Sequence, residues 1–441
     1  MVTMQRRSSC SSSIAPPPSY YPSSDAPAYS LEPSQSEERL ELSARRGRTL
    51  PTGPLLKRSG RITLLLQNQD EDASIPTYGR AATVSGEVQV KSKQDAKIIS
   101  VAIKLDCKLS LSVAEGFNTS TSLMSESFTL WENDRIHSRS CPYTFAFDLP
   151  MPTEGRMDDM PRPVSLPPSY NVDFAGVPGL YADSAYTITV TVTESKSTGL
   201  FKRKKRHSLV TPVNYYPRSR PHRPILPPDL SFHSTLKAAP EEWYQVITKM
   251  DSRKNSGIEP LDCHLFIPSV QIYGVCDTIP FYVQLRGPLS TLRAFQHTTP
   301  PPPPSSPLDF SSLLPAKYSS MQRPTIRVFL YRQVTVAVRG QKAWRTSVLG
   351  EGKLRPVVPY DEGGKEGYSL DWEGEVRCND DVTVGGFRMG PLVVKDFIVL
   401  SLVPPSPQTS PLVEHQHAHP IRLVTDSFME MMGPVPDGLL D

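Results

Sequence analysis

The chain has 441 residues, of which 38% are hydrophobic and 21% are charged, and its formal net charge is only +3. This length suits two or three domains of about 150 residues each. A net charge spread so thinly excludes a dedicated nucleic-acid binder, whose basic surface would dominate its domain. The 46 prolines indicate that ordered domains are interrupted by segments that do not fold.

Neither a leader nor a membrane span is expected. The N-terminal sequence MVTMQRRSSCSSSIAPPP lacks an apolar core. The longest apolar runs, ITLLL and FIVLSLV, are far shorter than the roughly 20 residues that cross a bilayer. Six scattered cysteines without a CxxC pair predict reduced, mostly buried thiols in a cytoplasmic protein. The pattern predicts neither a cofactor nor a metal site.

Residues 1–58 form a Ser/Pro-rich tail that is expected to be disordered, because it can bury too little apolar surface to offset the entropy of ordering. The tail contains a PPxY motif: Pro17, Pro18, Ser19 and Tyr20. Two prolines favour a polyproline II helix, the shape that WW domains bind in an aromatic-lined groove. The motif therefore predicts a WW-domain partner, with chance occurrence in Pro/Ser-rich sequence as the alternative.

After Gly60 the hydrophobic residues alternate with polar ones. The segments TVSGEVQV, KIISVAIKL, YTFAFDL and TITVTVT each place apolar side chains on one face, as half-buried antiparallel strands do. In YTFAFDL, Tyr143, Phe145, Phe147 and Leu149 are expected to share that face. Short strands with Gly/Pro-rich connections predict a β-sandwich over residues 59–216.

A second PPSY lies between two of these strands, at residues 167–170. Its prolines are expected to shape a corner of the sandwich, and Tyr170 to pack on it. A motif held in a folded corner cannot adopt the extended shape of a WW ligand. The two identical tetrapeptides therefore have different predicted roles.

Five consecutive basic residues follow in FKRKKRH and are expected at an exposed loop tip. They are Lys202, Arg203, Lys204, Lys205 and Arg206. One interpretation is a solvated loop without a ligand. Another is a site for anionic lipids or an acidic cargo tail, worth about 1 kcal/mol per basic residue near a membrane. A nuclear localisation signal is the third.

Strand patterns resume in the second half, at 280–285, 326–338 and 393–403. A proline-rich linker is expected at 217–230, a second β-sandwich at 231–428 and a C-terminal tail at 429–441. The polar segment 298–324 predicts a disordered insertion within the second sandwich. In EHQHAHP, three histidines share one face of a strand, and we interpret them as a surface cluster rather than a metal site.

These segments, in this order, resemble the arrestin family. The sequence CPYTFAFDLPMP…LPPSYNVDFAGVPGLYADSAYTITVTV is similar to the arrestin N-terminal domain. The segments CHLFIPSVQIYGVCDTIPFYVQLRG, LDWEGEVRCNDDVTVGGF and VKDFIVLSL are similar to the C-terminal domain of fungal α-arrestins, the arrestin-related trafficking adaptors. The likeness covers roughly residues 60–428 and implies two tandem immunoglobulin-type sandwiches. The buried salt-bridge core of visual and β-type arrestins has no match in the sequence.

The resemblance implies a function in trafficking. Such adaptors recruit HECT-type ubiquitin ligases, which carry WW domains, and bind the cytoplasmic tails of membrane transporters or receptors. The expected protein is cytoplasmic and recruited to the plasma membrane and endosomes. A signalling scaffold of the ambient-pH-sensing type, or a retromer-like endosomal subunit, is the alternative within the same fold.

An enzyme is the remote alternative. The sequence contains no GxSxG, P-loop, HExxH or Rossmann glycine pattern. Adjacent carboxylates such as Asp158-Asp159 would point to opposite faces of a strand and make poor acid–base pairs. A β-sandwich hydrolase with catalytic residues far apart in sequence stays open as a hypothesis.

Overall fold

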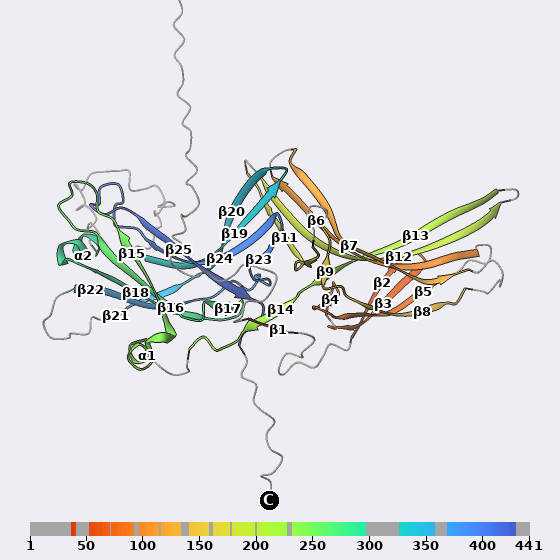
Figure 1. Cartoon of the computed structure of the whole chain (residues 1–441), viewed down its shortest axis with the longest axis horizontal. Coiled ribbons are helices and arrows are strands. Elements are labelled where there is room, and N and C mark those ends of the chain that lie inside the picture. The colour runs from red at the N-terminus through yellow and green to blue at the C-terminus, as the bar shows by residue number, and fades with distance from the viewer. Residues whose placement is uncertain are drawn as a thin grey trace, which may run out of the picture.

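The computed structural model describes residues 37–40, 53–70, 72–91, 97–113, 116–133, 141–157, 162–176, 179–198, 201–226, 232–296, 326–357 and 368–428. The predicted fold class is confirmed: the chain is all-β and forms two β-sandwich domains that lie end to end (Figure 1). The insertion predicted at 298–324 and the tail at 429–441 lie outside the described residues.

The first domain packs two sheets against each other. The smaller sheet consists of β2 (Gly53–Ser59), β3 (Ile62–Gln69), β5 (Thr83–Val90) and β8 (Thr144–Pro150). The larger sheet consists of β4 (Thr77–Tyr78), β13 (Phe201–Tyr215), β12 (Leu180–Thr198), β6 (Lys97–Val113) and β7 (Asn118–Glu132), with β11 (Tyr170–Phe174) also paired to β12. A separate short ribbon is formed by β9 (Glu154–Gly155) and β10 (Val164–Ser165).

Period-two alternation builds the core of this domain. Along β12, buried Tyr186, Ile188, Val190 and Val192 face the opposite sheet, while the threonines between them face outward. The same alternation buries Phe145 and Phe147 of β8. The expectation that Tyr143 shares that buried face is wrong: it lies one residue before β8 and is 53% exposed.

The second domain repeats the two-sheet plan. One sheet consists of β15 (Trp243–Met250), β16 (Leu261–Pro268), β18 (Ile279–Gly287), β22 (Tyr368–Val376) and β21 (Lys353–Val357). The other consists of β17 (Ile272–Gly274), β25 (His415–Val424), β24 (Leu392–Leu402), β19 (Ile326–Val338) and β20 (Gln341–Glu351), with β23 (Phe387–Met389) paired to β24.

Helices are few and short in the described part of the chain. They are α1 (Phe232–Ala238), the single 3-10 turn η1 (Pro240–Glu242) and α2 (Leu289–Gln296). In the described part of the chain, none of the helices combines the length and the apolar character that a membrane crossing requires. Cys107, Cys263 and Cys378 are buried thiols, as expected, whereas Cys276 is exposed.

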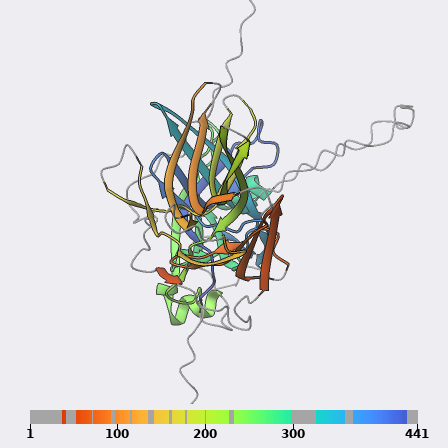
Figure 2. The same ribbon diagram turned by 90° about the vertical axis from the view of Figure 1, so that its right-hand side faces the viewer.

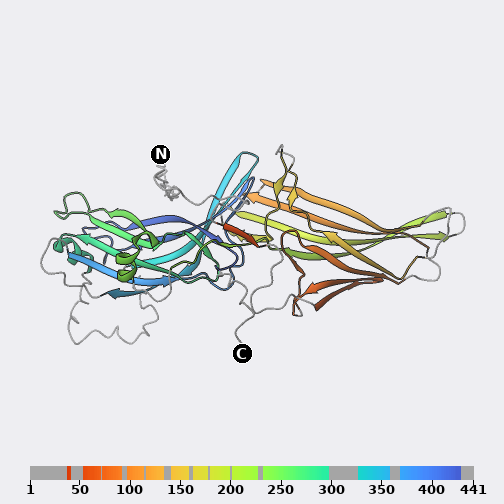
Figure 3. The ribbon, with the colours of Figure 1, turned by 60° about the horizontal axis from the view of Figure 1, so that its bottom comes forward.

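The domains share an apolar interface. The core of the first domain continues into the second through Val334 and Val336 of β19, Ala343 of β20 and Phe387 of β23. Figure 3 shows β19 and β20 reaching toward the first domain, and Figure 2 shows the same structure with the first domain facing the viewer. An interface that continues a hydrophobic core restricts the relative motion of the domains.

Two predicted boundaries need correction. Strand β1 (Glu37–Leu40) and all of β2 except Ser59 lie inside the segment 1–58 that was expected to be disordered, so that expectation is wrong for those residues. The segment 217–230 is more than a linker, because it contains β14 (Arg218–Pro221), which pairs antiparallel with β1. The connector is therefore partly strand, and it binds a piece of the N-terminal segment.

Candidate functional site

The first PPSY, Pro17–Tyr20, lies outside the described residues, so its geometry is not part of the site that follows. The second PPSY is held inside the fold. Pro167 and Pro168 are buried, and the Pro167 carbonyl accepts a hydrogen bond from the Tyr186 hydroxyl. The Ser169 amide donates to the Tyr215 carbonyl, and the Ser169 hydroxyl accepts from the Tyr215 amide, both at 2.8 Å. The buried prolines and these bonds keep the tetrapeptide from entering the groove of a WW domain.

Tyr170 belongs to the domain interface. It starts β11, and its ring meets the Phe387 ring of the second domain edge-on, with 5.4 Å between centroids. Burial raises the pKa of Tyr170 to about 12, against a smaller opposing effect of the Arg332 charge. The expected structural role of Tyr170 is confirmed, but the tyrosine packs across the interface rather than on its own sandwich alone.

Behind Tyr170 lies a buried ion pair, Arg332–Asp396. The two residues face each other directly across β19 and β24. Arg332 Nε donates to Asp396 Oδ1 at 2.7 Å and its terminal nitrogen to Oδ2 at 3.2 Å, while the same nitrogen reaches the Val384 carbonyl at 2.6 Å. Burial opposes the charged guanidinium, yet the Asp396 charge raises the pKa of Arg332 above its ordinary value. The guanidinium of Arg332 is therefore charged.

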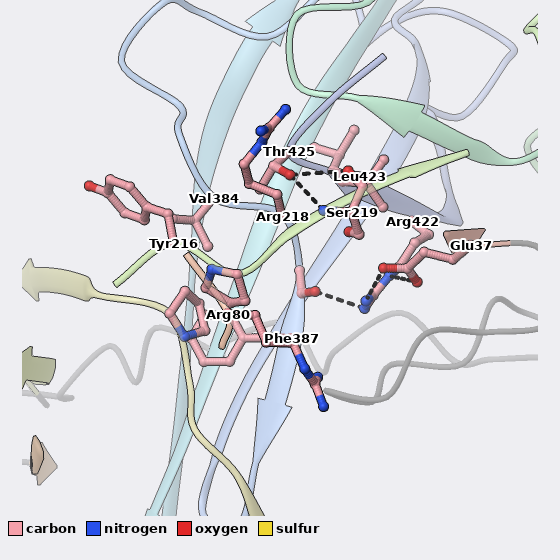
Figure 4. A pocket seen from close by; sticks show the side chains of 15 residues that line it. Glu37, Arg80, Tyr216, Arg218, Ser219, Val384, Phe387, Arg422, Leu423 and Thr425 are labelled. Carbon is pink, nitrogen blue, oxygen red and sulfur yellow. Dashed lines mark hydrogen bonds and ion pairs between the residues drawn. The ribbon is translucent and has the colours of Figure 1, made fainter. Parts of the chain in front are cut away.

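A second buried pair closes the groove between the domains (Figure 4). Arg422 of β25 meets both carboxylate oxygens of Glu37 at 3.1 Å, through Nε and one terminal nitrogen. Its other terminal nitrogen donates to the Gly386 carbonyl at 2.8 Å. A cavity of about 60 Å³ lies beside the pair and is also lined by Arg80 and Arg218. The groove is thus rich in arginine and carries one carboxylate from the N-terminal segment.

Arg218 fixes β14 to the end of the second domain. Its guanidinium binds Asp426 at 2.6 Å and 3.0 Å. The Ser219 amide donates to Thr425 Oγ1 at 2.9 Å, and the Asp426 amide donates to the Ser219 carbonyl at 3.0 Å. One side of β14 is therefore anchored by residues 425–426, and β1 occupies the other side.

The basic residues 202–206 lie on a strand and not in a loop. They form part of β13, which pairs with β12 in register up to Thr198↔Phe201. Lys204, Lys205 and Arg206 are exposed. Strand period places Lys204 and Arg206 on one face and Lys205 on the other. The hairpin extends past β6, whose pairing with β12 ends at Ser195↔Lys97, and it projects from the far end of the first domain (Figure 1).

A buried carboxylate lies at the base of this hairpin. Glu194 is 1% exposed and accepts from Arg61 at 2.6 Å through Oε1. Its Oε2 lies 3.4 Å from His207 Nε2, and neither atom has a hydrogen-bond partner among the described residues. The negative charge of Glu194 lies on the strand next to Lys205.

The three histidines of β25 do not converge on a ligand. His415 Nε2 lies 2.9 Å from Thr248 Oγ1, and His419 Nε2 lies 2.9 Å from Gln271 Oε1. Burial, followed by the neighbouring His417, lowers the pKa of His419 to about 4. Among the described residues, no group of three His, Cys, Asp or Glu side chains is placed to hold a metal ion. The cluster is more buried than the surface cluster that the sequence suggested.

Sequence reasoning missed the two buried pairs of the groove. A signal was present: Arg332, Asp396 and Arg422 are charged residues inside the mostly apolar strands IRVFLYRQVTVAV, LVVKDFIVLSL and HQHAHPIRLV. A buried charge requires a partner, so three such positions indicate ion pairs. The partner of Arg422 was beyond reach, since Glu37 lies 385 residues away in a segment expected to be disordered.

Comparison with known proteins returned no match, either among protein-family models or among curated proteins.

Proposed function

We propose that the chain is an adaptor of the arrestin-related class, which links a WW-domain HECT-type ubiquitin ligase to the cytoplasmic tails of membrane transporters or receptors. The observation that carries the proposal is the contrast between the two PPSY motifs. The second is fixed by hydrogen bonds within the fold, with buried prolines. That leaves Pro17–Tyr20, ahead of the first strand, as the candidate ligand for a WW domain.

The adaptor carries out no chemistry in this proposal. It raises the effective concentration of the ligase near its substrate, because one chain binds both. The apolar interface between the domains supports this role, since a body with restricted domain motion holds its two partners at a defined separation. The family resemblance of residues 60–428 supplies the trafficking context.

The basic segment of β13 is the proposed contact with anionic lipid headgroups. Three exposed basic residues at the end of a projecting hairpin can reach a flat surface before the rest of the domain does. Each contributes about 1 kcal/mol near an anionic membrane. This contact would recruit the adaptor to the plasma membrane or to endosomes.

The ligase contact is tested by titrating an isolated WW domain into full-length protein and following the heat of binding. Tyr20→Ala removes the ring that fills the WW groove and should abolish binding. Tyr21→Ala, one residue further along the same segment, is the matched control and should bind as wild type does. Equal binding of the wild type and Tyr20→Ala would refute the proposed ligase contact.

The membrane contact is tested by co-sedimentation with vesicles that contain phosphatidylserine. Replacing Lys204, Lys205 and Arg206 by serine should remove most of the binding, and wild-type binding should weaken from low to physiological salt. Serine at the exposed Lys249 and Lys353 of the second domain is the control and should leave binding unchanged. If neither salt nor either set of substitutions changes vesicle binding, the basic residues of β13 do not bind lipid and are simply solvated.

A further inference from the structure

We propose that the groove beside β14 is a binding site for extended acidic peptide segments, and that this chain fills it with its own β1. The site consists of the β14 edge that β1 pairs with and the guanidinium of Arg422. The inference does not depend on the WW-domain contact or the membrane contact, because it uses neither Tyr20 nor the basic segment of β13.

Strand β1 has a single partner among the described strands. It pairs with β14 over four residues, from Glu37↔Pro221 to Leu40↔Arg218, and with no other described strand. An isolated two-stranded ribbon of this size is marginal in water. The bidentate ion pair of Glu37 with Arg422 strengthens this attachment, because charge-assisted hydrogen bonds are stronger than neutral ones.

The binding groups are fixed independently of β1. Arg422 lies on β25 within the second-domain sheet; one terminal nitrogen is held by the Gly386 carbonyl and its amide by the Gln271 carbonyl. β14 is held from its opposite side by Thr425 and Asp426. A site whose donors are already oriented binds a ligand with a small entropy cost. Removal of β1 would thus leave a formed edge and a formed arginine.

Charge and shape determine what the groove accepts. Three arginines line the cavity beside the pair, and Glu37 is its one acidic lining residue. Arg218 is already neutralised by Asp426, so the groove keeps an excess of positive charge that matches an acidic ligand. The β14 edge adds main-chain pairing, which selects an extended segment with its carboxylate at the position of Glu37. The ligand class is therefore an acidic peptide in a β conformation.

The test uses full-length protein and a fluorescent peptide that covers residues 34–42, SQSEERLEL. In wild type, β1 competes for the groove, so the peptide should bind weakly. Glu37→Gln weakens that competition and should tighten peptide binding at least tenfold. Arg422→Gln should abolish binding. These effects are measured by fluorescence anisotropy, with thermal unfolding recorded for each variant.

Peptide variants supply the matched control. Replacing the glutamate at position 37 of the peptide by glutamine should remove binding to the Glu37→Gln protein. The same change at position 38 should have little effect, because neighbouring residues on a strand face opposite sides. Equal losses for the two peptides would show non-specific attraction to positive charge and overturn the proposal.

Hydrogen exchange in the wild-type protein tests whether the peptide displaces β1 from the groove, and it does not require the Arg422→Gln protein to fold. Saturating peptide should speed amide exchange at residues 37–40 while residues 218–221 stay protected. If the peptide binds without faster exchange at residues 37–40, it does not displace β1 and the proposal is wrong. The proposal is also wrong if the Glu37→Gln protein binds the peptide no more tightly than wild type does. A wild-type dimer that Glu37→Gln dissociates would also overturn the proposal, because β1 would then be exchanged between copies.

Discussion

The interface between the domains and the far end of the first domain bury carboxylates in different ways. At the domain interface, Asp396 and Glu37 each meet an arginine through both oxygens. At the far end, Glu194 meets Arg61 through one oxygen, and its second oxygen faces His207 without a hydrogen bond. All three carboxylate residues are at most 8% exposed. Burial alone therefore does not distinguish them; the number of arginine contacts does.

The carboxylates at the interface have both oxygens bound by arginine, whereas the site at Glu194 is incomplete because one oxygen has no hydrogen bond. A two-point arginine fork fixes the orientation of both partners and satisfies the charge. A one-point contact leaves an acceptor whose desolvation is not fully offset. The interface end holds the two domains in one arrangement, whereas the far end supports a hairpin that extends into solvent.

The largest expected effect is at the interface pair. Asp396→Asn leaves the buried Arg332 guanidinium without a counter-charge, and such a loss typically costs about 3–5 kcal/mol of unfolding free energy. Chemical denaturation followed by intrinsic fluorescence measures it.

Asp380→Asn is the matched control for this prediction. It breaks the Arg377–Asp380 pair, whose side chains are 61% and 92% exposed. An exposed pair contributes at most about 1 kcal/mol. If the two substitutions have equal effects, burial of the Arg332 pair does not matter to stability.

The sequence predicted the strands better than the groove between the domains. Alternation in TITVTVT and IRVFLYRQVTVAV depends on the local period of a strand, so β12 and β19 were correctly anticipated. The bounds of β8 and the strand nature of residues 201–206 were missed, because charge runs and strand ends carry weak local signals. The Glu37–Arg422 pair joins segments at opposite ends of the chain, and local patterns hold no information about such a contact.

The next largest effect tests whether the second PPSY belongs to the interface. Tyr170→Ala removes the ring against Phe387 and should lower the unfolding free energy by about 3 kcal/mol, the low end for a large aromatic because the residue is only partly buried. Tyr170→Phe keeps the ring and should cost about 1 kcal/mol. Tyr20→Ala should leave the melting temperature unchanged. A Tyr170→Ala protein of wild-type stability would contradict the interface role.

The buried imidazole of His419 makes the free energy of unfolding depend on pH. The pKa of His419 is lowered from 6.5 to about 4, mainly by burial. The unfolded chain takes up this proton near pH 6.5 and the folded protein only near pH 4, so the contribution of the neutral imidazole is complete above pH 6.5 and is lost as pH falls. At pH 5 the loss reaches about 2 kcal/mol.

The variant His419→Gln, measured by denaturation from pH 7 to pH 5, should flatten this dependence. The exposed His233, replaced in the same way, is the control for the loss of one imidazole. A His419→Gln protein with the slope of wild type would show that other groups cause the pH dependence.

The smallest expected effect is at the incomplete site. Glu194→Gln keeps an oxygen for Arg61 and places an amide donor next to His207 Nε2, which has no hydrogen-bond partner among the described residues. Arg61 is 21% exposed and can be solvated when the negative charge is removed. The loss of unfolding free energy should therefore be about 1 kcal/mol, the value of one hydrogen bond. Vesicle binding should not fall, since the exposed basic residues of β13 remain and a nearby negative charge is gone.

The measurement is chemical denaturation of Glu194→Gln beside Asp396→Asn under the same conditions. Equal losses would mean that one arginine contact fixes a buried carboxylate as firmly as two, and the distinction between the interface and the far end would then be wrong.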